Sequence, residues 1–164
     1  MIFSGPVLAG GVTFGPHDVE TVFAIGKSDD GNQFQYALRL EPDCTISMKE
    51  PVFGYWREYD KGPNKLVQMG WLDGFGYGID KQKVNADKTG LTMSIKTAAT
   101  RVIEIIAKRV GERCEATAYT PINGKRAQLK LIFVQLSGPL SVSSVAIRGV
   151  DAATGEALVE RVMQ

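Results

Sequence analysis

One short aromatic segment carries the densest set of side chains able to recognise a ligand. Residues 55–59 are Tyr-Trp-Arg-Glu-Tyr, in which the rings offer stacking surfaces and Arg57 offers a planar clamp for a carboxylate. In a strand, Tyr55, Arg57 and Tyr59 share one face and Trp56 lies on the other. Aromatic strands are more often packing devices. We therefore rank a structural role, with Trp56 in the core and Arg57 paired with a local acid, above a ligand site.

The sequence lacks the residues that most catalytic sites require. His17 is the single histidine, which excludes a Ser-His-Asp triad and multi-histidine metal sites, and we expect it to face solvent. The alternating glycines at 74–78 do not form a phosphate-binding loop. We accordingly predict no catalytic residue, no metal and no cofactor. An enzyme would have to act through carboxylates, for example Glu58 with Asp73 or Asp80, and nothing in the spacing requires that pair.

The two cysteines, Cys44 and Cys114, have no C-x-x-C spacing, which argues against zinc and thioredoxin-like chemistry. They are compatible with one disulfide in an exported protein or with two thiols in a cytoplasmic one. We favour buried thiols, because free cysteine is among the most buried residue types.

The charge balance and hydropathy argue against a nucleic-acid partner and against a membrane-spanning helix. Nineteen Lys and Arg residues face eighteen Asp and Glu residues, and a net charge of +1 predicts no nucleic-acid partner. No apolar run approaches the roughly 20 residues of a membrane-spanning helix. The opening residues have no basic segment and are broken by Gly and Pro, as in a poor secretory signal. We expect a soluble protein, either cytoplasmic or exported with a signal peptide absent from this chain.

The pattern around these residues is that of strands and turns. We expect an extended lead-in over residues 1–16 and one β-rich domain over residues 17–164. The clearest strand is 33–40, where Phe34, Tyr36, Leu38 and Leu40 alternate with polar residues. A hairpin partner precedes it and an aromatic strand follows from Val52. Short alternating segments separated by turn signals continue from Ile79, including Asn-Gly at 123–124.

These segments predict an all-β fold. About ten strands in series, joined by short reversals, give an antiparallel meander, and a sheet of that length closes into a barrel or splits into a two-layer sandwich. Leu66, Met69 and Gly70 fall at helical spacings after Pro63. We therefore expect one short helix from Pro63 to about Asp73.

A linear pattern in the first half of the chain resembles an uncharacterised bacterial family, a domain of unknown function. The pattern includes Lys27-Ser28, Tyr36 to Leu40, Tyr55-Trp56-Arg57 and Tyr77-Gly78-Ile79. The resemblance implies a small β-rich domain, often exported, with no established activity. It also marks a set of residues for a shared site or for the core and its turns: Lys27, Asn32, Tyr36, Arg39, Tyr55, Trp56, Arg57 and Tyr77.

The leading hypothesis is a non-enzymatic module that binds a small amphipathic ligand or a partner segment in a pocket with Arg57 at its rim. The proposed ligand-binding residues are Tyr36, Arg39, Tyr55, Trp56, Arg57 and Tyr77. A second hypothesis is an interaction protein that assembles through a strand edge, for example as a homodimer. The third is the carboxylate-based hydrolase-type enzyme.

Overall fold

The computed structural model describes residues 12–62, 65–70, 76–138 and 141–163. Within these ranges the chain forms eleven strands and one 3-10 turn. In chain order these are β1 (Val19–Lys27), β2 (Gln33–Leu38), β3 (Val52–Arg57), the turn η1 (Tyr59–Lys61), β4 (Leu66–Gln68), β5 (Ile79–Val84), β6 (Gly90–Ile95), β7 (Ala98–Val110), β8 (Arg113–Ile122), β9 (Lys125–Gly138), β10 (Ser141–Asp151) and β11 (Ala157–Met163).

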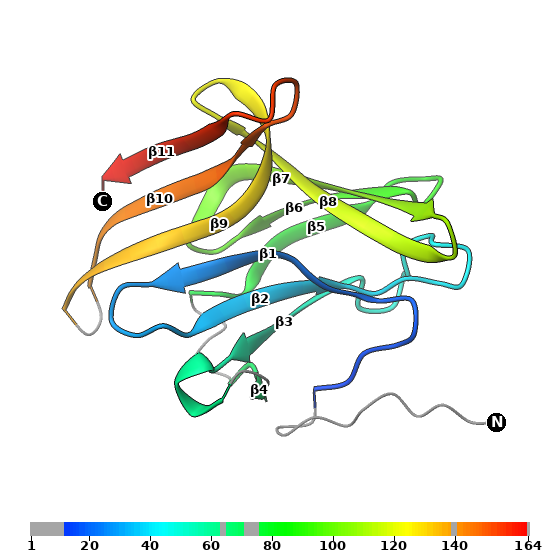
Figure 1. The fold of residues 1–164 in the computed structure, drawn as a ribbon, viewed down its shortest axis with the longest axis horizontal. Coiled ribbons are helices and arrows are strands. Elements are labelled where there is room, and N and C mark those ends of the chain that lie inside the picture. The colour runs from blue at the N-terminus through cyan, green and yellow to red at the C-terminus, as the bar shows by residue number, and fades with distance from the viewer. Residues whose placement is uncertain (1–11, 63–64, 71–75, 139–140, 164) are drawn as a thin grey trace.

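The strands form one folded sheet, which confirms the all-β prediction. Its order is β4-β3-β2-β1-β9-β8-β7-β6-β5, and β10 and β11 extend it from the other edge of β9 (Figure 1). The end strands β4 and β5 do not pair with each other, so the sheet is open rather than a barrel. It bends into two packed layers, with β1–β4 in one and β5–β8 in the other. The fold is therefore sandwich-like.

The central strand β9 joins the two layers. Its first residues pair with the end of β8, and Leu131–Val134 then pair with β1 in parallel. Lys130 is an extra residue opposite β10, a β-bulge that changes which side of β9 faces the core. Leu129 is buried in the core before the bulge and Ile132 after it. The parallel β1–β9 pair departs from the predicted antiparallel meander, because short turns determine only the pairing of consecutive strands.

The main core lies between the layers and is built from the alternating residues seen in the sequence. The even-numbered side chains of β2 meet the apolar side chains of β6 and β7 across this space. The fully buried members include Phe34, Tyr36 and Leu38 from β2, and Ile95, Ile103 and Ile105 from β6 and β7. Burial of this apolar surface is the main stabilising contribution to the fold.

The predicted helix from Pro63 to Asp73 is wrong where the structure describes it. Residues 66–68 are strand β4, which pairs antiparallel with Tyr55–Arg57 of β3. Pro63 and Asp73 lie outside the described residues. Leu66 is buried against the outer face of the sheet, and pairing along the edge of β3 outweighs the weak helical spacing.

The two cysteines form a disulfide, so the prediction of buried thiols is wrong. Cys44, in the loop after β2, is bonded to Cys114 at the start of β8, and the two Cα atoms lie 5.3 Å apart. A second contact supports the same junction, since Arg109 of β7 donates to the Pro42 carbonyl over 2.6 Å. Both contacts hold the loop of one layer against the other layer.

A second, smaller apolar cluster lies on the outer face of β2–β4. Val12 and Phe14 pack there against Tyr55 and Leu66. Residues 1–11 of the expected lead-in lie outside the described residues. Among the described residues, no helix has the length and apolarity needed to cross a membrane.

Candidate functional site

A cavity of about 480 Å³ lies at the edge of β3, beyond the end of β4. β4 covers only residues 55–57 of β3. The backbone N–H of Glu58 donates to the Lys65 carbonyl. Because backbone groups alternate along a strand, the even-numbered residues of β3 direct their N–H and carbonyl groups toward β4. Gly54 therefore directs its N–H and carbonyl toward Met69, which follows β4 and lies opposite Gly54 in this register. The cavity lies at this end of the β3–β4 pair and is lined by the side chains around it.

Four of the six predicted ligand-binding residues line this cavity. These are Tyr36, Arg39, Tyr55 and Tyr77, whereas Trp56 and Arg57 are not among the lining residues. The expected position of Arg57 at the pocket rim is therefore not what the structure shows.

The lining residues differ in whether a ligand in the cavity could contact them. Tyr36 is 0% exposed and Tyr55 is 1% exposed, so neither offers surface to a ligand in this conformation. The reachable apolar surface comes instead from Phe53, Met69 and Ile79. These three residues are not among the predicted ligand-binding residues. They come from β3, the residue after β4 and the start of β5, and only the three-dimensional structure brings them around one space.

An aromatic cluster forms the inner wall of the cavity. Tyr77 stacks on Phe34 with ring centroids 5.2 Å apart and meets Trp56 edge-on at 4.9 Å. Tyr36 donates its hydroxyl proton to the Tyr77 carbonyl over 2.6 Å. Burial raises the pKa of Tyr36, with a further contribution from Tyr77. These contacts hold the segment before β5 against β2 and β3.

Lys27 covers the outer side of the same cluster. Its ammonium lies 4.9 Å from the Trp56 ring centroid and 3.3 Å from an Asp30 carboxylate oxygen. Burial lowers the pKa of Lys27, but the hydrogen bond and charge of Asp30, helped by Asp29, outweigh it and raise the pKa overall. Lys27 and Trp56, two residues of the sequence pattern, are therefore packed together.

Arg39 reaches the cavity mouth from a partly buried ion pair. Its Nη1 donates to Asp18 over 3.2 Å, and its guanidinium lies 4.4 Å from the Phe53 ring centroid. The Asp18 side chain is only 2% exposed and also accepts hydrogen bonds from the backbone N–H groups of Gly15 and Leu40. The charge of Asp18 is thus fully partnered, and Arg39 is held in one orientation.

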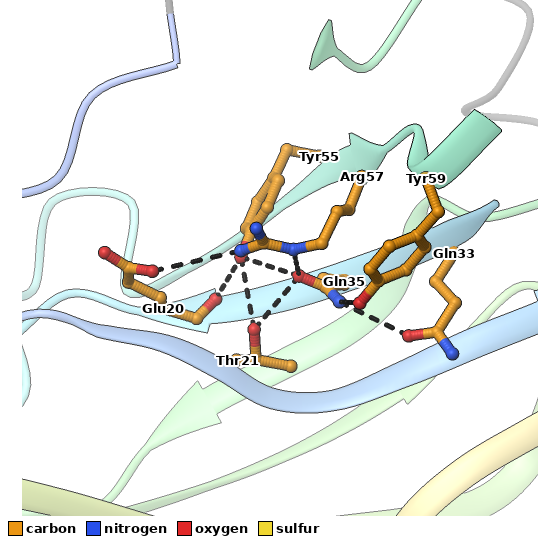
Figure 2. Close-up of polar contacts among 7 residues, drawn as sticks. All are labelled: Glu20, Thr21, Gln33, Gln35, Tyr55, Arg57 and Tyr59. Carbon is orange, nitrogen blue, oxygen red and sulfur yellow. Dashed lines mark hydrogen bonds and ion pairs between the residues drawn. The ribbon is translucent and has the colours of Figure 1, made fainter. Parts of the chain in front are cut away.

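Arg57 belongs to a separate polar network on the outer face of β1–β3 (Figure 2). At its centre the Oε1 atom of Gln35 accepts from Arg57 Nε at 2.8 Å and lies 3.0 Å from both Tyr55 Oη and Thr21 Oγ1. The Gln35 side-chain amide donates to Tyr59 over 3.4 Å. Gln35 itself is 4% exposed. The predicted pairing of Arg57 with a local acid is a long contact of 3.9 Å to Glu20.

Two of the carboxylates considered for an enzyme have separate partners. Glu58 forms an ion pair with Lys61 at 3.0 Å, and Asp80 accepts from Ser94 over 3.3 Å. Neither lines the cavity. Asp73 lies outside the described residues. The described part of the chain thus does not bring this carboxylate pair together in the cavity.

Comparison with protein families identifies the chain. A family model described as a domain of unknown function, DUF4833, matches residues 23–161. This confirms the resemblance to a domain-of-unknown-function family that the sequence pattern indicated. The searches among curated proteins and among solved structures found no match. Since the model covers most of the sequence, the chain belongs to the DUF4833 family.

Proposed function

We propose that this protein is a binding module that holds a small amphipathic ligand in the cavity beside β3. The observation that carries the proposal is the cavity itself, about 480 Å³ in volume, with both apolar and charged side chains in its lining. Small-molecule sites are typically concave and largely apolar, with a few polar groups that orient the ligand. Here Arg39 and Glu50 supply charge, and Phe53, Met69 and Ile79 supply apolar surface.

A matched pair of variants tests the site. The neutral fluorescent probe N-phenyl-1-naphthylamine emits more strongly in apolar surroundings and is titrated into the protein. Met69→Trp fills part of the cavity, whereas Met48→Trp places the same residue at an exposed position that does not line it. We expect saturable binding to the unsubstituted protein, clearly weaker binding to Met69→Trp and unchanged binding to Met48→Trp. Equal binding by both variants would place the probe elsewhere.

A second function is supported by the last strand. β11 pairs only with β10 among the described strands, and it exposes Val159, Val162 and Met163. An edge strand with exposed apolar side chains can add a strand from another chain. On this proposal, light scattering at rising protein concentration shows a dimer, and Val159→Lys shifts it toward the monomer. A constant monomer mass at the highest concentration argues against assembly through β11.

The disulfide supports the exported alternative for localisation. Disulfides persist mainly in oxidising compartments outside the cytosol, and Cys44–Cys114 joins the two layers of the fold. Trapping of free thiols at the moment of cell lysis tests this proposal. An exported protein would show no labelling of either cysteine, whereas labelling of both would indicate a reducing compartment.

A further inference from the structure

The charges at the cavity mouth are not balanced. Arg39 and Glu50 are the charged side chains among the described residues that line it. Arg39 already has a partner in Asp18, a carboxylate held in place by three hydrogen bonds. Glu50 lies further from the guanidinium, with Oε2 3.8 Å from Nη2. One arginine therefore faces two carboxylates, and the local formal charge is −1.

Glu50 is the carboxylate of the two that a ligand can reach. Its side chain is 64% exposed, compared with 2% for Asp18. Its backbone has φ of 54°, a left-handed conformation that is uncommon for a residue other than glycine. The adjacent Lys49 is exposed and does not line the cavity. Glu50 is thus positioned at the mouth with a negative charge that Arg39 does not fully compensate.

We propose that the ligand of this cavity is a cationic amphiphile, with an ammonium or guanidinium head against Glu50 and an apolar body against Phe53, Met69 and Ile79. The inference rests on the proposed function, since it names the class of ligand for the same cavity. Arg39 is not a competing anion site, because its guanidinium is occupied by Asp18 on its edge and by the Phe53 ring on its face. An anionic head beside Arg39 would add a third negative charge to those of Asp18 and Glu50 around a single arginine.

Three ligands that share one ring system test the charge preference. The cation 1-naphthylmethylamine, the neutral 1-naphthalenemethanol and the anion 1-naphthoate are titrated into the protein by fluorescence at low salt. We expect the cation to bind most tightly and the anion least tightly. The difference between cation and neutral ligand should be about two- to fivefold, the range for one partly exposed ion pair, and it should shrink as salt is added.

Two matched variants assign the preference to one carboxylate. Glu50→Gln removes the charge at the mouth and should bring the cation and the neutral ligand to equal affinity. Glu156→Gln makes the same change in the exposed turn between β10 and β11, away from the cavity residues, and should leave the preference intact.

The other possible results show whether the ligand class alone is wrong or the binding site itself is wrong. If the three ligands bind equally, or if the anion binds most tightly, the cationic class is wrong and the cavity remains a binding site. If Glu50→Gln leaves a cation preference unchanged, Glu50 is not its source and the inference is also wrong. If none of the three ligands binds, the proposed function fails together with the inference.

Discussion

Arg57 donates its Nε–H to the Oε1 atom of Gln35 over 2.8 Å, on the outer face of the first layer. Arginine can only donate, so this contact fixes which end of the Gln35 amide is oxygen. The amide nitrogen then points toward Gln33 and Tyr59 (Figure 2). One buried glutamine thus holds the polar side chains of β1, β2 and β3 in register.

Replacing this glutamine should destabilise the fold. Gln35→Leu leaves the partly buried Nε–H of Arg57 without its acceptor, at a cost of about 1–3 kcal/mol. The free energy of unfolding in urea measures this cost. Gln82→Leu, at an exposed position of β5, is the matched control and should change stability little. Equal stability of the two variants would show that the network does not contribute.

Stability should fall at alkaline pH because two tyrosines are buried. Burial raises the pKa of Tyr36, and it raises the pKa of Tyr55 although Thr21 and Arg57 act in the opposite direction. The folded state therefore holds these protons more tightly than the unfolded state. Their contribution is complete below the ordinary tyrosine pKa of about 10 and is lost as the pH rises above it. Unfolding midpoints measured across this range should fall, and Tyr36→Phe should make the fall less steep. An identical slope in the variant would contradict this assignment.

Two glycines should be intolerant of a methyl group, to different degrees. An alanine Cβ at Gly149 would lie 2.1 Å from the Gln128 backbone oxygen, and at Gly54 it would lie 2.2 Å from the Phe34 ring. A ring can shift and a paired backbone cannot, so Gly149→Ala should cost more than Gly54→Ala, which should cost about 1–3 kcal/mol. Gly31→Ala is the control, because no atom lies within 4 Å of its added Cβ. Thermal unfolding should rank the three variants in this order, and any other order would contradict the packing described here.

Loss of the disulfide should be the largest single change in stability. Cys44 and Cys114 are 70 residues apart, and closing a loop of this length stabilises the fold by about 4 kcal/mol in the chain-entropy account. Cys44→Ser should therefore unfold at a much lower urea concentration. The reduced unsubstituted protein and the Cys44→Ser/Cys114→Ser double variant should match it. A reduced protein as stable as the oxidised one would show that the bridge contributes nothing.

The fold class could be predicted because strand alternation is a local property of the sequence. The face of β2 that carries Tyr36 and Leu38 lies in the main core between the two layers. The disulfide and the β1–β9 pair could not be predicted, because they join residues far apart in the chain and leave no local pattern. Strand β4 was missed for the same reason, since its conformation depends on the edge of β3.

For the candidate site, too, the residue types could be predicted from the sequence, whereas their arrangement in space could not. Aromatic and arginine residues near the cavity could be selected by type, among them Tyr36, Arg39 and Tyr77. Their exposure could not be predicted, and Tyr36 is too buried to contact a ligand. Phe53 and Met69 have no distinguishing feature in the sequence. They are candidates because they line the cavity at the end of β4.

NMR mapping of a bound ligand tests the proposed binding site beside β3 directly. The neutral ligand 1-naphthalenemethanol is titrated into isotope-labelled protein, and the amide shift changes are assigned along the chain. We expect saturable changes concentrated at Phe53, Gly54, Tyr77 and Ile79, which line the cavity. Changes confined to other surfaces, or no saturable change at all, would contradict a binding site beside β3.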